Sequence, residues 1–157
     1  MCMRDSSDAQ DHLARGGVVV IYPEGTLTRD PLRWPMHAYP GAARLALGLD
    51  VPVIPIAHWG DQQILGRDSR WRVHVSLRPR RPVRVRVGEP VDLSRFRSTR
   101  APGQTGRTDA ERVAAVPRAA AAEATDAILD AIAAELSVLR DEPVPPTRWD
   151  RRLRGRR

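Results

Sequence analysis

The segment VVVIYPEGTLTRD, residues 18–30, joins five apolar residues to a proline, a carboxylate, a glycine and then an arginine. The apolar run is β-branched and too short for a helix, so residues 18–22 are predicted to form a fully buried strand. Gly25 allows close backbone approach, and N–H groups in such a turn can form an anion-binding concavity. Open α/β sheets bind their ligands at the carboxyl ends of strands. The segment therefore predicts a strand that leads into an anion-binding loop.

Charged side chains near this loop suggest phosphate as the anion. Arg29 and Arg33 follow the turn, and arginine binds phosphate through two parallel hydrogen bonds. Glu24 does not fit this scheme, because a carboxylate repels phosphate. It fits only if it orients an arginine or accepts a hydrogen bond from a substrate hydroxyl. The alternative is an ordinary strand-to-loop turn with a solvated glutamate.

The length and composition of the chain limit the classes of protein that fit. A chain of 157 residues suits one domain with its own core. The net charge of +7 comes from arginine alone, with no lysine or asparagine, a bias typical of GC-rich coding sequence. It is therefore weak evidence for a polyanionic partner. The single cysteine, Cys2, favours a reducing compartment. No apolar run approaches the ~20 residues of a membrane-spanning helix, and the polar N-terminus is unlike a signal peptide.

Hydrophobic periodicity predicts an alternation of helices and strands. Helices are expected at residues 7–15, 41–49 and 119–140. Strands are expected at residues 18–22 and 51–57, the second an edge strand or an irregular one because Pro52 and Pro55 cannot donate to a ladder. Alternating valines predict a strand pair around the basic turn RPRRP, residues 78–82.

The resulting fold class is α/β, with a mixed, largely parallel sheet and flanking helices. The strand, helix and strand of residues 18–57 form a predicted βαβ unit. Four parts are expected along the chain: a partial α/β core at 1–97, a linker at 98–117, an amphipathic helix at 118–141 and a basic flexible tail at 142–157.

Three ordered blocks resemble the glycerolipid acyltransferase family, whose best-known member is 1-acylglycerol-3-phosphate acyltransferase. YPEGTLTRD resembles its (F/Y)PEGTRS block, PGAARLAL its Gly-Ala-rich helix, and VPVIPIA its (V)PV(I/V)PV strand. The resemblance covers residues 16–93, about half the chain. The Ala-rich helix ending in LRDEP is similar to that of actinobacterial members. The resemblance implies a glycerolipid acyltransferase-like fold, lacking an N-terminal part.

Family positions carry over to this sequence residue by residue. The phosphate and glycerol site of the acceptor would be lined by Pro23, Glu24, Gly25 and Thr26. The family arginine usually follows the threonine directly, but Leu27 holds that position here. The phosphate contact is therefore assigned to Arg29, two residues later. VPVIPIA corresponds to the block associated with the acyl donor and the wall of the active site.

The catalytic HxxxxD block of the family has no counterpart in this sequence. In that block histidine takes the proton of the acceptor hydroxyl and aspartate fixes the imidazole. None of the four histidines has an aspartate five residues later. His58 and Asp61 are three apart, and His58 is interpreted as a loop or rim residue. No catalytic residue is assigned, no metal or cofactor is expected, and the chain by itself is predicted to be inactive and prone to self-association.

The leading hypothesis is transfer of a fatty acyl group from acyl-CoA or acyl carrier protein to 1-acylglycerol-3-phosphate or a related lysolipid. The expected location is cytoplasmic, peripheral to the inner face of the cell membrane. An anionic membrane surface is an expected partner, through the arginines around Trp149. One alternative is a non-catalytic lipid- or phosphate-binding remnant of such an enzyme. A nucleic-acid binder is disfavoured, because no nucleic-acid module is recognised. The arginines in question are Arg148, Arg151, Arg152, Arg154, Arg156 and Arg157.

Overall fold

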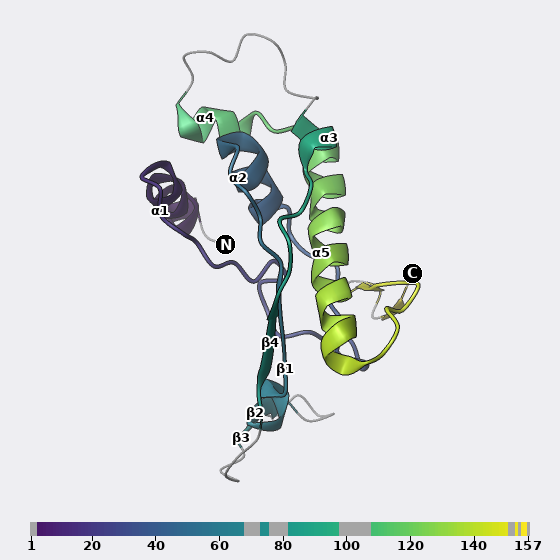
Figure 1. Ribbon diagram of the computed structural model, residues 1–157. Helices are drawn as coiled ribbons and strands as arrows, with labels where there is room; N and C mark the ends of the chain where they lie inside the picture. Colours follow the sequence, from purple (N-terminus) through teal and green to yellow (C-terminus); the bar gives the residue numbers. More distant parts are fainter. Residues whose placement is uncertain are drawn as a thin grey trace.

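The computed structural model describes residues 3–67, 73–75, 82–97, 108–150, 153 and 155–156 (Figure 1). The helices are α1 (Met3–Ala14), α2 (Gly41–Leu49), α3 (Ser94–Arg97), α4 (Asp109–Ala114), α5 (Arg118–Arg140) and the 3-10 turn η1 (Asp61–Gln63). The strands are β1 (Ile56–Trp59), β2 (Leu65–Arg67), β3 (Val73–Val75), β4 (Arg84–Val87), β5 (Trp149–Asp150) and β6 (Gly155–Arg156). The three predicted helices are confirmed, α1 beginning four residues earlier than expected.

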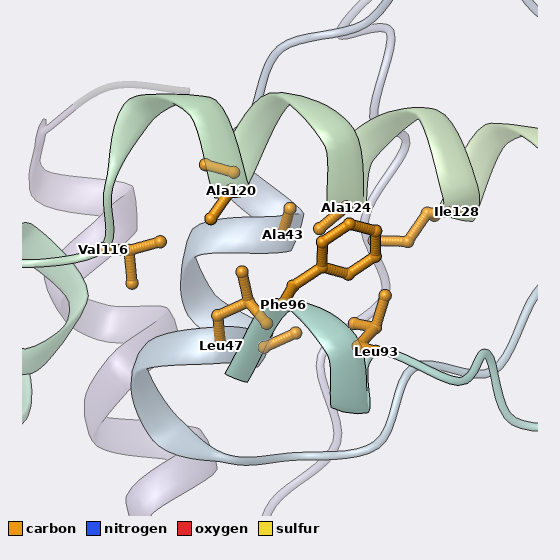
Figure 2. Close-up of a cluster of buried hydrophobic side chains, with 10 residues drawn as sticks. Ala43, Leu47, Leu93, Phe96, Val116, Ala120, Ala124 and Ile128 are labelled. Atoms are coloured by element: carbon orange, nitrogen blue, oxygen red, sulfur yellow. The ribbon is translucent and has the colours of Figure 1, made fainter. Parts of the chain in front are cut away.

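The main core lies where α5 packs against α2 and the short helix α3 (Figure 2). Alanines on one side of α5 are fully buried, and their small size lets the neighbouring helix approach closely. The aromatic ring of Phe96 fills the remaining space beside Ala124 and Ile128. From α2, Ala43, Ala46 and Leu47 join this core.

A two-stranded antiparallel sheet, β1 with β4, runs along the lower half of α5 (Figure 1). Ala57 points toward α5 and is buried, and Arg86 pairs with Glu135 of that helix. Alternate residues therefore point away from α5, because successive side chains of a strand point to opposite faces. This open face presents exposed apolar side chains, namely Ile54, Ile56, Val85 and Val87.

Two strand predictions are wrong. Residues 18–22 form no strand, and Val18, Val20 and Tyr22 are 83%, 74% and 71% exposed. No described segment pairs with this run, so its backbone has no ladder partner among the described residues, while Val19 and Ile21 are half-buried. The predicted hairpin around RPRRP is also wrong: β3 pairs with β2, and β4 pairs with β1. Residues 78–81 of that turn lie outside the described part of the chain.

The irregular strand at residues 51–57 is only partly regular, as its prolines predict. Only Ile56 and Ala57 of that range belong to β1. Before them, the carbonyl oxygens of Pro55 and Val53 accept hydrogen bonds from the N–H groups of Gly88 and Val91, at 2.9 Å each. The partner segment is antiparallel. The predicted βαβ unit lacks its first strand, and the largely parallel sheet stays a prediction.

The second half of the chain contains more structure than expected. α4 lies within the predicted linker and packs against α2, and it begins with a capping box between Thr108 and Glu111. The described part of the predicted flexible tail folds back on the molecule as the β5–β6 pair. Arg148 binds Asp126 and Asp130 of α5, so the described tail is packed rather than extended. No helix in the described residues is long and apolar enough to cross a membrane.

Candidate functional site

The loop that follows Tyr22 is organised around the buried carboxylate of Asp30. This side chain is 3% exposed, and it accepts hydrogen bonds from the backbone N–H groups of Leu32 and Trp34, both at 3.1 Å. Thr28 closes the same loop, because its hydroxyl donates to the Trp34 carbonyl oxygen at 2.9 Å. A short loop with this many internal bonds presents its remaining side chains in fixed positions.

The Pro-Glu-Gly turn stands at the start of this loop. The Gly25 N–H donates to the Tyr22 carbonyl oxygen at 3.0 Å, which closes the turn. Gly25 has φ 65°, a conformation that glycine adopts at no steric cost. A Cβ there would meet only the Tyr39 ring, at 3.8 Å, so conformation rather than space requires glycine. The Tyr39 N–H in turn donates to the Pro23 carbonyl oxygen at 3.2 Å and fixes the other side.

Glu24 points its carboxyl group into this folded loop. Burial raises the pKa of Glu24 to about 7; a hydrogen bond from the Met36 backbone opposes the rise, and the nearby Asp30 charge adds to it. One carboxyl oxygen, Oε2, is buried and lacks a hydrogen-bond partner among the described residues. Near neutral pH Glu24 is therefore present in both its neutral and its ionised form. This protonation removes much of the repulsion between Glu24 and phosphate that the sequence presented as a difficulty.

The other predicted contact residues lie on the outer side of the loop. Thr26 and Arg29 are exposed, and the Arg29 N–H donates to the Met36 Sδ at 3.0 Å. Arg33 is exposed as well, with φ 59° and its N–H bonded to the Asp30 carbonyl oxygen at 2.8 Å. The structure thus brings the five predicted residues into one loop, with Glu24 inside and Arg29 outside.

Several residues that support this loop were not recognised from the sequence. Met36 is 1% exposed and forms a parallel bridge with Trp149, and the His37 N–H donates to the Trp149 carbonyl oxygen at 3.1 Å. Arg156 forms an ion pair with Asp30. The turn at Asp30 could have been recognised from the sequence, because Asp30 precedes Pro31 and an Asp-Pro pair favours the start of a turn. The contacts of Trp149 and Arg156 could not, since they join residues more than a hundred positions apart.

The histidine interpreted as a rim residue lies on β1. The His58 Nδ1 is 3.0 Å from Oδ1 of Asp61, the first residue of η1. The Tyr22 ring meets the His58 ring edge to face, with centroids 6.3 Å apart. His58 therefore lies next to the residue that begins the Pro-Glu-Gly turn. The described residues contain no group of three or more histidine, cysteine or acidic side chains suited to a metal ion.

Comparison with known proteins adds one finding. Residues 3–59 match the Acyltransferase family model. The matched segment contains the turn at Glu24, the whole Asp30 loop, α2 and β1, and it ends at Trp59. This acyltransferase match supports a general acyltransferase role. No curated protein and no solved structure matches the chain.

Proposed function

We propose that the chain serves acyl transfer from the thioester of coenzyme A or acyl carrier protein to the hydroxyl of a lysolipid. The observation that carries the proposal is the acyltransferase match over residues 3–59, the segment that holds the half-buried Glu24. The preferred acceptor is 1-acylglycerol-3-phosphate or a related lysophospholipid, because the loop combines the tight Pro-Glu-Gly turn with the exposed side chain of Arg29.

Within this proposal the loop residues have separate tasks. The backbone of Gly25 approaches the acceptor phosphate, and Arg29 supplies the positive charge on the outer side of the loop. Glu24 accepts a hydrogen bond from an acceptor hydroxyl when ionised and donates one to a phosphate oxygen when neutral. Its pKa of about 7 makes both forms available at neutral pH.

The lipid part of the substrate suits the apolar surface next to this loop. Val20 and Tyr22 lead into the turn and are exposed, and Ile56 is exposed on β1. Exposed apolar groups that lie together favour contact with an acyl chain or a membrane. A location at the inner face of the cell membrane follows from such a substrate. Two of the tail arginines predicted to bind a membrane, Arg148 and Arg156, instead form ion pairs with acidic residues of the chain.

Titration calorimetry with sn-glycerol 3-phosphate tests the proposal. We expect Arg29→Ala to weaken binding by about 1.5–3 kcal/mol, the range for hydrogen bonds to charged groups. Arg118→Ala is the matched control, because Arg118 is an exposed arginine at the first residue of α5. Equal affinities of the Arg29 variant and the parent chain would remove Arg29 from the site. Binding without any acyl transfer in the presence of acyl-CoA would favour the non-catalytic remnant.

A further inference from the structure

The pair His58 and Asp61 has the geometry of a histidine oriented by a carboxylate. The 3.0 Å contact joins Nδ1 to Oδ1, which fits a neutral imidazole that donates its Nδ1–H to the aspartate. In that tautomer the second ring nitrogen, Nε2, carries a lone pair and accepts protons. A carboxylate that fixes the tautomer of a histidine is the arrangement by which enzymes activate hydroxyl groups.

The fold between the two residues holds this arrangement in place. β1 ends at Trp59, and the chain reverses at Gly60, which has φ 111°. A Cβ at this position would collide with the Pro82 carbonyl oxygen, so the reversal requires glycine. The Gly60 N–H donates to the Gln62 Oε1 at 2.8 Å, and η1 then begins at Asp61. Asp61 therefore returns to His58 through a turn with few alternatives.

The surroundings of His58 suit a lipid acceptor. His58 points to the open face of the sheet, where its cross-strand neighbour is Val85 and the next pair is Ile56 with Val87. The His58 side chain is 40% exposed, so a substrate can reach the imidazole ring. On the other side the Tyr22 ring connects His58 to the Pro-Glu-Gly turn. A proton acceptor thus stands between an apolar surface and the proposed phosphate loop.

We propose that His58 is the general base of this site and that Asp61 is its positioning residue. The inference rests on the proposed acyl transfer. As the acceptor oxygen attacks the thioester carbonyl carbon, its proton moves to Nε2 of His58. When the tetrahedral intermediate collapses, the carbon–sulfur bond breaks and the leaving thiolate takes that proton. The imidazole returns to its neutral form, and the products are an ester and a thiol. This inference predicts slow turnover that depends on His58, whereas the sequence predicts a chain that is inactive by itself.

Two assays on the full chain separate the base from the proposed acceptor. The first follows cleavage of p-nitrophenyl butyrate, in which water is the acceptor. The second follows acyl-CoA with lysophosphatidic acid. We expect His58→Gln to lower both rates by about 10²–10⁴-fold, the usual contribution of a positioned base. His12→Gln is the control, because His12 is an exposed histidine on α1, and its rates should match those of the parent.

Each outcome bears on one claim. The parent chain could cleave the ester in a way that depends on His58 and yet fail to acylate the lysolipid. This result would support His58 as the base and reject the proposed function. Acylation of the lysolipid at an unchanged rate in His58→Gln would keep the function and reject the base. Ester cleavage by the parent chain no faster than in buffer would also reject the base.

A spectroscopic measurement tests Asp61 independently of turnover. In ¹⁵N NMR spectra the neutral His58 ring should carry its proton on Nδ1, and Asp61→Asn should shift the population toward the Nε2–H tautomer. The same variant should lower kcat with little change in KM, because Asp61 acts through His58 and not on the substrate. A tautomer ratio that Asp61→Asn leaves unchanged would overturn the positioning role.

Discussion

The pKa of Glu24 makes the stability of the protein depend on pH in an unusual direction. Its value in the fold is about 7, against 4.5 for the ordinary side chain. Between these values the folded chain holds a proton that the unfolded chain has released. The free energy of unfolding therefore falls as the pH rises from about 4.5 to about 7. Most paired carboxylates act in the opposite direction, because their pKa values are lowered by folding.

The size of this effect follows from the difference of the two values. One pKa unit corresponds to 1.36 kcal/mol, so Glu24 should account for a loss of about 3 kcal/mol by pH 7.5. Glu24→Gln keeps the shape of the side chain and stays neutral. The variant should match the parent chain near pH 4.5 and exceed its free energy of unfolding by about 3 kcal/mol above pH 7.

Urea unfolding at a series of pH values, followed by circular dichroism, measures the difference between the two chains. Subtracting the two curves cancels the contribution of every carboxyl group that both chains share, apart from groups coupled to Glu24 such as Asp30. Glu123→Gln serves as the control, because Glu123 is exposed on α5 and its curve should follow that of the parent. Parallel curves for the parent and Glu24→Gln between pH 4.5 and pH 7 would refute the buried, partly unsatisfied carboxyl described above.

Three further changes test the loop and its support, each by urea unfolding. Asp30→Ala should lower the free energy of unfolding by about 3–5 kcal/mol, because it leaves the Arg156 guanidinium and two backbone N–H groups without their buried partner; a loss below about 1 kcal/mol would contradict the role of Asp30. Gly25→Ala should cost about 1–2 kcal/mol through its left-handed backbone, and an unchanged midpoint would contradict that conformation. Arg140→Ala should lower the free energy of unfolding by about 1–3 kcal/mol. The Arg140 guanidinium carbon lies 4.5 Å from the centre of the Trp34 ring and 4.3 Å from that of Trp59, and the guanidinium donates to the Leu32 carbonyl oxygen at 2.8 Å. Arg118→Ala, which removes an exposed arginine of the same helix, should have little effect.

The helices were predictable from the sequence because each carries its own signal. α2 and α5 show an apolar stripe, and a left-handed residue, Asp50 or Asp141, follows each of them. α4 was missed although its capping box, Thr108 to Glu111, is a readable pattern. The strands were harder, since a strand exists only when a partner lies beside it. Residues 18–22 have the composition of a strand but no described partner, and β4 pairs with β1 rather than with β3.

The candidate site divides in the same way. The Pro-Glu-Gly turn and Arg29 were found from the sequence, because glycine, proline and charge mark a loop locally. The state of Glu24 was not predictable, since its pKa follows from burial within a loop that Asp30 and Met36 close. The contact of His58 with Asp61 depends on the chain reversal at Gly60. The two residues are three apart, so they do not match the HxxxxD spacing. Local signals thus located the loop, and tertiary contacts set its chemistry.

The contacts of Trp149 and Arg156 with the loop of residues 28–37 have a consequence for biosynthesis. The ribosome synthesises the loop early, and it adds Trp149 and Arg156 more than a hundred residues later. The loop therefore lacks these contacts while most of the chain is being made. During that interval Asp30 lacks its arginine and Met36 lacks its backbone neighbour. A nascent chain that stops before residue 149 therefore exposes an unfinished loop to proteases and chaperones.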